Sequence, residues 1–294
     1  MERKLVQMGK HCLMAAIPKK WIKHHNLQKG DSINFEEVEQ YLLISPNPLP
    51  KDKSISITIK QANRIGIYRI LQLLYDAGFK TIRINYDTPD TLTWLLWSVK
   101  AMEEWRLETI NKNKCIIKTI NIERDDFQNY FRRIFLITKS LSETYSEFLN
   151  GKKELIDEIR AKHLLIISGT QTIKRMINTS SLPLEYKYYY FIAIQLEEIA
   201  DQYEYLLRAL EKQGLEKVNK IPKELIQSQK KLCKLLEETY NNFYKFDIDW
   251  FIDLSKRDIW QSFATENNPL LTYHLRAISE RIKNIAKYTI GIRL

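Results

Sequence analysis

The chain has few of the residues that build disulfide frameworks or sharp loops. Its three cysteines, Cys12, Cys115 and Cys233, lie far apart and form no CxxC pair. This spacing excludes the common zinc-binding patterns and indicates reduced thiols in a cytosolic protein. Only eight glycines occur in 294 residues, and this scarcity favours long helices with few tight turns.

Long apolar runs are also missing. The stretch closest to a membrane span, Tyr188–Leu196, contains Gln195 and is followed by acidic residues, whereas a spanning helix needs about 20 apolar residues. The segment Met1–Lys10 lacks the apolar centre of a secretion signal. We therefore expect a cytoplasmic protein without membrane insertion.

Positive charge, in contrast, is plentiful. The chain has 46 Lys and Arg residues against 36 Asp and Glu, a formal net charge of +10. Within Glu2–Gly30 there are seven Lys or Arg residues and a single acid, Glu2. Such an excess favours contact with a polyanion, nucleic acid or anionic lipid, although a solvated basic surface has the same composition.

The first of three predicted regions, residues 1–45, is small and rich in strands. It ends before Pro46–Lys51, whose three prolines predict a stiff extended linker. The expected elements are strands at Glu2–Gln7 and Cys12–Ile17 around a Gly9-Lys10 turn, a helix at Lys19–His25 opened by Pro18, and strands at Ser32–Phe35 and Tyr41–Ser45. A unit of this size buries little surface alone, so we expect it to dimerise.

The second region, residues 54–122, predicts a small open α/β layer in the order β-α-β-α-β. The expected elements are a strand at Ser54–Ile59, a helix that ends at Gly78, a strand at Thr81–Tyr86, a helix at Leu92–Trp105 and a strand at Cys115–Ile120. No glycine-rich phosphate-binding loop follows any of these strands.

The third region, residues 126–294, predicts an all-helical bundle, or two stacked three-helix units. Helical periodicity and Pro/Gly breaks delimit six helices, at Phe127–Phe148, Leu155–Ile177, Leu184–Lys212, Pro222–Phe246, Ile248–Phe263 and Pro269–Ile290. The predicted fold class is thus a multidomain α+β protein.

The first region resembles a known DNA-binding domain. Gln7–Ile22, which includes Gly9, the Ile17-Pro18-Lys19 sequence and Trp21, followed by Leu27-Gln28-Lys29-Gly30-Asp31, is similar to the swapped-hairpin AbrB (SpoVT/MazE-type) family. The resemblance implies a homodimer of exchanged hairpins that binds double-stranded DNA. By position, the DNA-contacting residues implied are Arg3, Lys4, Lys10, Lys19 and Lys20.

A second motif lies in the third predicted helix. Glu197 and Asp201 are separated by four residues, which places both carboxylates on one helical face, where they can chelate a hard cation or simply be solvated. Their sequence, Leu196-Glu197-Glu198-Ile199-Ala200-Asp201, resembles the repeated motif of PhoU-type phosphate-uptake regulators. The resemblance implies a divalent or iron-type metal at Glu197 and Asp201.

The sequence departs from this motif in two places. Gln202 stands where the family usually has histidine, and a second copy in the sixth helix has Arg276 at the glutamate position and Glu280 at the aspartate position. A cation at Arg276 would replace a metal in the second copy. The combination of an AbrB-like region and a helical PhoU-like region resembles PhoU-type regulators found in archaea.

Three functional hypotheses follow, none of them enzymatic, because no nucleophile lies in a catalytic context and the five histidines are not near obvious acidic partners. The first is a DNA-binding transcriptional regulator of phosphate uptake. The second is a protein-interaction regulator of a phosphate transporter or its signalling components, in which the first region only dimerises. The third is an antitoxin-like protein.

Overall fold

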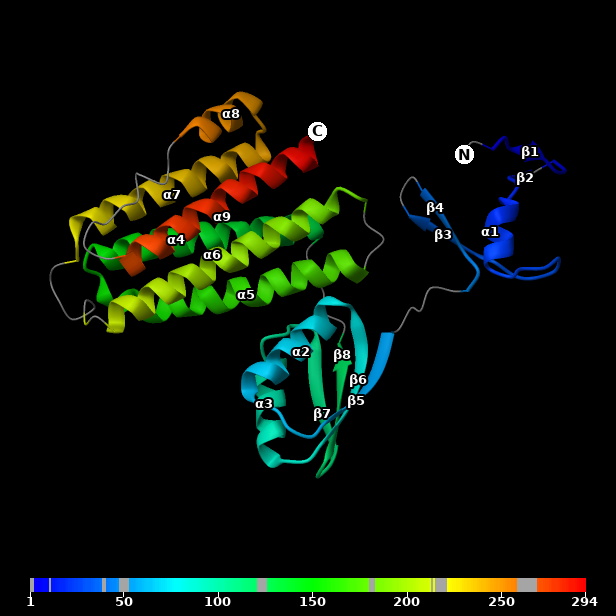
Figure 1. Ribbon diagram of the computed structural model, residues 1–294, viewed down its shortest axis with the longest axis horizontal. Helices are drawn as coiled ribbons and strands as arrows, with labels where there is room; N and C mark the ends of the chain where they lie inside the picture. Colours follow the sequence, from blue (N-terminus) through cyan, green and yellow to red (C-terminus); the bar gives the residue numbers. More distant parts are fainter. Residues whose placement is uncertain are drawn as a thin grey trace. The chain divides into compact units, whose positions relative to one another are not determined.

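A computed structural model describes residues 3–10, 12–38, 41–47, 53–120, 126–179, 183–212, 214, 221–257 and 269–294. The chain divides into two compact units, Met1–Lys51 and Asp52–Leu294. The fold is mixed α+β, with small sheets and a helical C-terminal region (Figure 1), in agreement with the fold class predicted from the sequence.

The first unit, called the head below, contains two hairpins and one short helix. Its elements are β1 (Val6–Gln7), β2 (Leu13–Met14), α1 (Lys19–His24), β3 (Asn34–Val38) and β4 (Tyr41–Ser45). The turn after β1 and the helix after Pro18 lie where the sequence predicts them. The first two strands are much shorter than expected, because they pair only with each other and have no third strand or core to extend them.

The α/β layer, residues 53–120, consists of a four-stranded sheet and two helices. Its elements are β5 (Lys53–Ile59), α2 (Arg64–Asp76), β6 (Phe79–Tyr86), α3 (Pro89–Val99), β7 (Trp105–Asn111) and β8 (Lys114–Thr119). The strand order is β5-β6-β8-β7, with β5 parallel to β6 and the other pairs antiparallel. Asn63 caps α2 by accepting from the Gly66 amide at 2.8 Å, and Gly78, with φ +82°, ends it.

The predicted order of this layer was wrong in one element. Trp105 ends the predicted second helix, but α3 already ends at Val99, and Trp105 begins the strand β7. The physical reason is a hairpin: β7 pairs with β8 across a short turn, and the Trp105 ring is buried with its Nε1 donating to the Phe79 carbonyl at 3.3 Å. The layer is therefore β-α-β-α-β-β.

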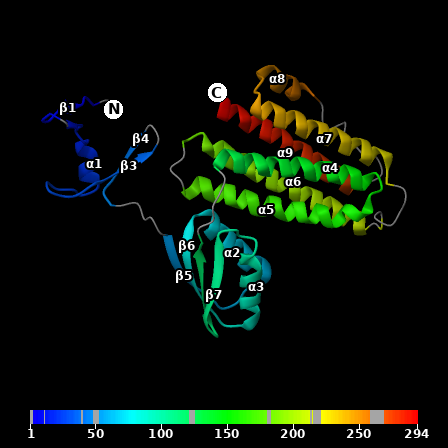
Figure 2. The ribbon, with the colours of Figure 1, turned by 180° about the vertical axis from the view of Figure 1, so that it is seen from behind.

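The helical bundle, residues 126–294, is built on α4 (Phe127–Leu149), α5 (Ile156–Thr179), α6 (Tyr186–Lys212), α7 (Lys223–Tyr244) and α9 (Pro269–Arg293). A short 3₁₀ turn (Lys153–Leu155) precedes α5, and α8 (Ile248–Lys256) follows α7. Helix α6 packs against both α5 and α9 (Figures 1 and 2). The fifth predicted helix is shorter in the structure, and residues 258–263 of that prediction lie outside the described residues.

Two separate hydrophobic cores stabilise the second unit. One lies between the bundle helices, around Phe131, Tyr203 and Ile282, and the other lies between the sheet and the α2–α3 pair, around Leu71 and Trp105. Of the helices in the described part of the chain, none has the combination of length and hydrophobicity needed to cross a membrane.

Candidate functional site

The basic residues predicted to contact DNA are all exposed on the head. Gly9, with φ +76°, turns the chain between β1 and β2, and the Met8 amide donates to the Cys12 carbonyl at 2.8 Å. Arg3, Lys4 and Lys10 lie along this hairpin. At the start of α1, Pro18 accepts the first helical hydrogen bonds, and Lys19 and Lys20 form the exposed first turn. His11 lies outside the described residues.

The head has no core within a single chain. Of the head residues whose side chains the structure describes, none is buried. Apolar side chains are instead open to solvent: Leu5, Val6, Met8, Leu13 and Met14 around the first hairpin, and Phe35, Leu42 and Leu43 on the second. Exposed apolar side chains that lie close together are typical of surfaces that bind a partner.

The PhoU-like acidic pair lies where the bundle meets the α/β layer. Glu197 of α6 is partly buried against α5, and its Oε2 atom accepts from Lys174 Nζ at 2.9 Å and from Thr170 Oγ1 at 3.1 Å. Gln72 of α2 donates to its other oxygen at 3.4 Å. Lys174 also lies 3.3 Å from Asp76 at the end of α2. One ammonium group therefore serves two carboxylates from two different helices.

Asp201 has a different partner. Its Oδ1 atom lies 2.8 Å from His163 Nε2 of α5. The sequence-based statement that the histidines are not near acidic partners is wrong for His163, because the packing of α5 on α6 brings together residues far apart in the chain. His274 of α9 contacts Gln202, with 2.8 Å between Nδ1 and Oε1, and burial lowers its pKa.

Burial and the nearby Lys174 ammonium have opposite effects on the pKa of Asp76. Burial raises the pKa of this carboxyl from 3.8 to about 6, even though Lys174 and Arg175 favour its ionised form. Although burial alone would lower the pKa of Lys174, the Glu197 and Asp76 carboxylates raise it above its ordinary value. Lys174 is thus the firmly charged member of the cluster, and Asp76 is the member that titrates near neutrality.

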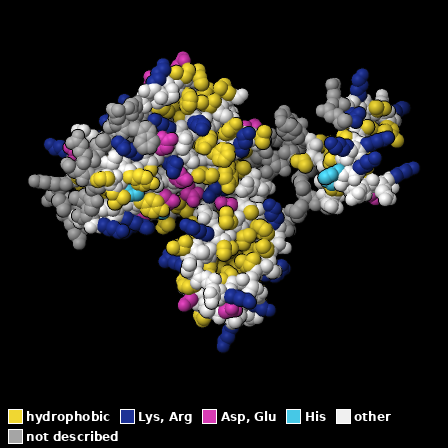
Figure 3. Space-filling model, viewed as in Figure 1, with side chains coloured by type: hydrophobic (Ala, Val, Ile, Leu, Met, Phe, Trp, Pro, Cys, Tyr) yellow, Lys and Arg dark blue, Asp and Glu magenta, His cyan; other side chains and the backbone are white. Residues whose placement is uncertain are grey.

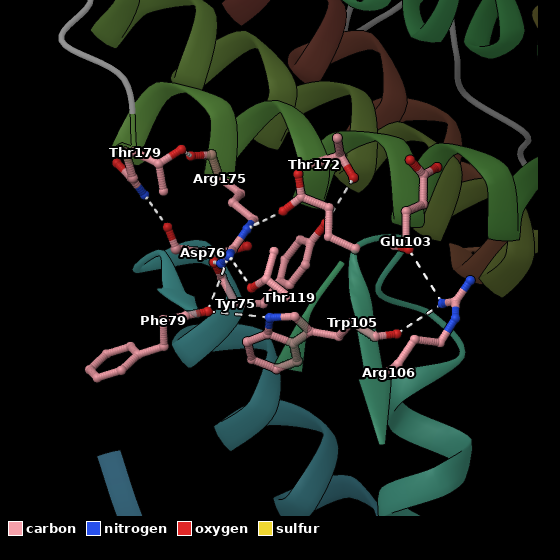
Figure 4. A network of polar contacts seen from close by, with 12 residues as sticks. Tyr75, Asp76, Phe79, Glu103, Trp105, Arg106, Thr119, Thr172, Arg175 and Thr179 are labelled. Atoms are coloured by element: carbon pink, nitrogen blue, oxygen red, sulfur yellow. Dashed lines mark hydrogen bonds and ion pairs between the residues drawn. The ribbon is translucent and has the colours of Figure 1, made fainter. Parts of the chain in front are cut away.

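A second buried cation, Arg175, holds the α/β layer against α5 (Figure 4). Its guanidinium forms an ion pair with Glu104 and donates to the Tyr75 carbonyl at 2.6 Å and the Phe79 carbonyl at 3.1 Å. It also donates to Thr119 Oγ1 at 3.1 Å. Four segments of the layer therefore meet one side chain of the bundle: the end of α2, the start of β6, the turn before β7 and the end of β8.

Glu103, next to Glu104, extends this contact to two bundle helices. Its carboxylate accepts from Tyr130 of α4 at 2.9 Å and from Ser168 of α5 at 3.3 Å. The acidic turn before β7 thus docks the layer onto the bundle. The polar contacts of Lys174, Arg175, Glu103, Glu104 and Asp76 are called the seam below.

The residues around Glu197 and Asp201 do not assemble a metal-ligand set. Within the described ranges, no group of three or more His, Cys, Asp or Glu side chains is placed to hold a metal ion, and Lys174 neutralises the Glu197 carboxylate. In the second motif copy, Arg276 and Glu280 are partly exposed on α9. The metal at Glu197 and Asp201 stays a prediction from the resemblance.

Sequence reasoning missed most of the seam. Lys174 and Arg175 give one signal: they follow Ser168-Gly169-Thr170-Gln171-Thr172, an uncharged stretch of small and polar residues in the middle of a helix, which indicates close packing on both sides. The buried state of Thr170, Gln171 and Thr172 agrees with that signal. Glu103 and Glu104 were hidden because the turn that holds them was assigned to a helix.

No protein-family model, curated protein or solved structure matches this chain.

Proposed function

We propose that this protein is a homodimeric transcriptional regulator that binds double-stranded DNA through its head and regulates phosphate uptake. The helical bundle is then the module that senses a ligand or binds a partner. The observation that carries the proposal is the composition of the head surface: exposed Arg3, Lys4, Lys10, Lys19 and Lys20 lie beside apolar side chains that need a second copy.

The charge pattern supports DNA as the partner. Lys and Arg side chains neutralise phosphates and release counterions, so a cluster of them on a small dimer grips a duplex without further chemistry. The assignment to phosphate uptake comes from the PhoU-like motif around Glu197 and Asp201. The seam supports a signalling role for the bundle, because it joins α5 and α6 of the bundle to the α/β layer through buried charges.

Fluorescence polarisation with the full chain tests the proposal. The probes are duplexes from the protein's own promoter and from phosphate-transporter promoters, with scrambled duplex as control, at ~0.15 M salt. The test variant is Lys10→Ala/Lys19→Ala/Lys20→Ala. The matched control, Lys223→Ala/Lys230→Ala/Lys245→Ala, removes three exposed charges of α7 and its C-cap instead.

The expected result is a preference for one promoter that collapses in the head variant and survives in the control. If the head variant and the control variant both bind every duplex weakly and equally, the protein does not recognise a DNA sequence and the proposal is refuted.

A second candidate function is favoured by the same head surface. Exposed apolar residues such as Leu13 and Leu42 require dimerisation whether or not DNA is bound. The head would then only dimerise, and the body would dock on a phosphate transporter or its signalling components. Co-purification with transporter subunits that persists in the Lys10→Ala/Lys19→Ala/Lys20→Ala variant would favour this function.

A further inference from the structure

One face of the four-stranded sheet is left open in the second unit. Helices α2 and α3 cover the other face, where Ile82, Ile84 and Tyr86 of β6 point inward and are buried (Figure 1). The alternate residues of the same strand, such as Arg83 and Asn85, are exposed. The side chains of the neighbouring strands alternate in the same way, so every second residue of each strand points outward, and these outward side chains form the open face.

Strand register arranges this outward set in three cross-strand rows. The rows are Ser54–Thr81–Lys118–Arg106, then Ser56–Arg83–Ile116–Glu108, then Thr58–Asn85–Lys114–Asn111. Hydroxyl and amide groups occupy the β5 side and cations occupy the centre and the β8–β7 side. Three interstrand spacings make the face about 14 Å across.

Charge on this face is strongly one-sided. It has four cations and one acid, Glu108, which pairs with Lys118 at 2.8 Å. Within the described part of the chain, neither the Arg83 nor the Lys114 side chain has a hydrogen-bond or ion-pair partner. These two charges are therefore available to a ligand.

Three other acids of the layer lie away from this face. Asp76, Glu103 and Glu104 face the bundle in the seam, and Figure 3 shows acidic side chains gathered where the bundle meets the α/β layer. The three rows therefore hold four cations and one acid, while these three acids lie toward the bundle. A basic face of this kind attracts polyanions.

We propose that the open face of the β5-β6-β8-β7 sheet binds the phosphate backbone of duplex DNA as a second contact surface of the protein. Lys, Arg, Ser, Thr and Asn side chains are common phosphate ligands, and they make up most of this face. It presents no aromatic side chain, so it lacks the stacking platform that single-stranded nucleic acids use. A flat face about 14 Å across lies on the backbone and does not enter a groove of about 12 Å.

The choice of DNA over other polyanions rests on the proposed function. Because the head and the sheet belong to one chain, a duplex held by the head is present at high effective concentration for the sheet. The sheet contact adds affinity for any sequence, since phosphates carry no base information. Base recognition is left to the head.

The test is a salt series of fluorescence-polarisation binding with the full chain and a scrambled duplex. The sheet variant Arg83→Thr/Lys114→Thr removes the two unpaired cations and keeps residues that favour strands. The matched control Arg69→Ala/Lys100→Ala removes two exposed cations from the helical side of the same layer. Circular dichroism and the unfolding midpoint check the fold, and Arg83→Gln/Lys114→Gln replaces the first variant if it unfolds.

We expect the sheet variant to bind about tenfold more weakly at ~0.15 M salt, and its slope of log K against log salt to fall by about 2. The control should bind as the wild type does. Equal losses in the sheet variant and the control, or no loss in the sheet variant, would overturn the inference. Tighter binding of duplex RNA or anionic vesicles than of DNA would overturn the choice of partner.

The two proposals fail separately. Binding that is lost in the Lys10→Ala/Lys19→Ala/Lys20→Ala variant but unchanged in the sheet variant leaves the proposed function standing and refutes the second surface. Binding that is lost in the sheet variant but unchanged in the head variant does the reverse.

Discussion

Replacing Arg175 by methionine tests whether the seam joins the bundle and the α/β layer into one cooperative unit. The Arg175 and Glu104 side chains are only 4% and 16% exposed. Methionine removes the charge but keeps most of the volume, so the main effect is that the Glu104 carboxylate loses its ion pair with Arg175 in a largely dry site. Breaking such a pair costs about 3–5 kcal/mol of unfolding free energy.

The other contacts of Arg175 add less to this cost. The Phe79 carbonyl keeps the hydrogen bond from Trp105 at 3.3 Å, and the Tyr75 carbonyl keeps the one from the Gly78 amide at 3.0 Å. Neither backbone group is orphaned by the substitution. The lost ion pair with Glu104 therefore dominates, and the double variant Arg175→Met/Glu104→Gln should recover part of the loss.

Urea unfolding with two probes measures the effect at one fixed protein concentration. Circular dichroism at the helical band reports mainly the bundle, and tryptophan fluorescence is weighted toward the layer, which contains Trp94, Trp97 and Trp105. The two transitions should coincide in the wild type. In Arg175→Met the fluorescence transition should move to lower urea, ahead of the helical one.

Arg160 provides the control on the same helix. It pairs with Glu211 at 2.5 Å, but the two side chains are 44% and 31% exposed, so Arg160→Met should cost at most about 1 kcal/mol. Equal losses in Arg160→Met and Arg175→Met would refute the reasoning. So would a double variant as unstable as the sum of its two single changes.

Three further predictions concern other parts of the structure. Asp76 has a folded-state pKa of about 6, so its contribution to the free energy of unfolding should be greatest below pH ~4 and should fall by up to about 3 kcal/mol as the pH rises through 6. Asp76→Asn should flatten this part of the curve of stability against pH. Gly169→Ala places a methyl group against the Ile134 side chain and should cost about 1–3 kcal/mol in thermal or urea unfolding, with a smaller added loss in an Ile134→Ala background. Leu13→Lys places a charge on the exposed apolar surface of the head and should convert the proposed dimer to a monomer, as measured by light scattering, without changing the circular dichroism of the bundle. A dimer that persists in this variant would contradict an interface formed by the head.

The sequence predicted elements well where the signal is local. The turn at Gly9, the helix after Pro18, the end of α2 at Gly78 and the starts of α7 and α9 at prolines all depend on backbone preferences of single residues. β7 was missed because Trp105 falls at a helical distance from Trp94 and Trp97. The alternation in Trp105–Asn111 and the polar turn before Lys114 are instead typical of a β-hairpin.

The seam could not be predicted from one sequence for a different reason. Glu197 and Lys174 are 23 residues apart, and Arg175 and Glu104 are 71 apart. Their meeting depends on the rotation of α5 about its axis and on where the layer docks, neither of which is encoded in a local pattern. The motif around Glu197 and Asp201 gives no indication of Lys174 and His163, which contact these two carboxylates.

None of the described side chains of the head is buried, so the proposed function would depend on the concentration of the protein. The unit Asp52–Leu294 has its own hydrophobic cores, whereas in the proposed homodimer the head gains a core only when two chains meet. The concentration of chains with a folded head then rises with the square of the total protein concentration when the protein is scarce, and the fraction of such chains rises in proportion to it. Modest changes in synthesis would be converted into larger changes in the number of competent heads.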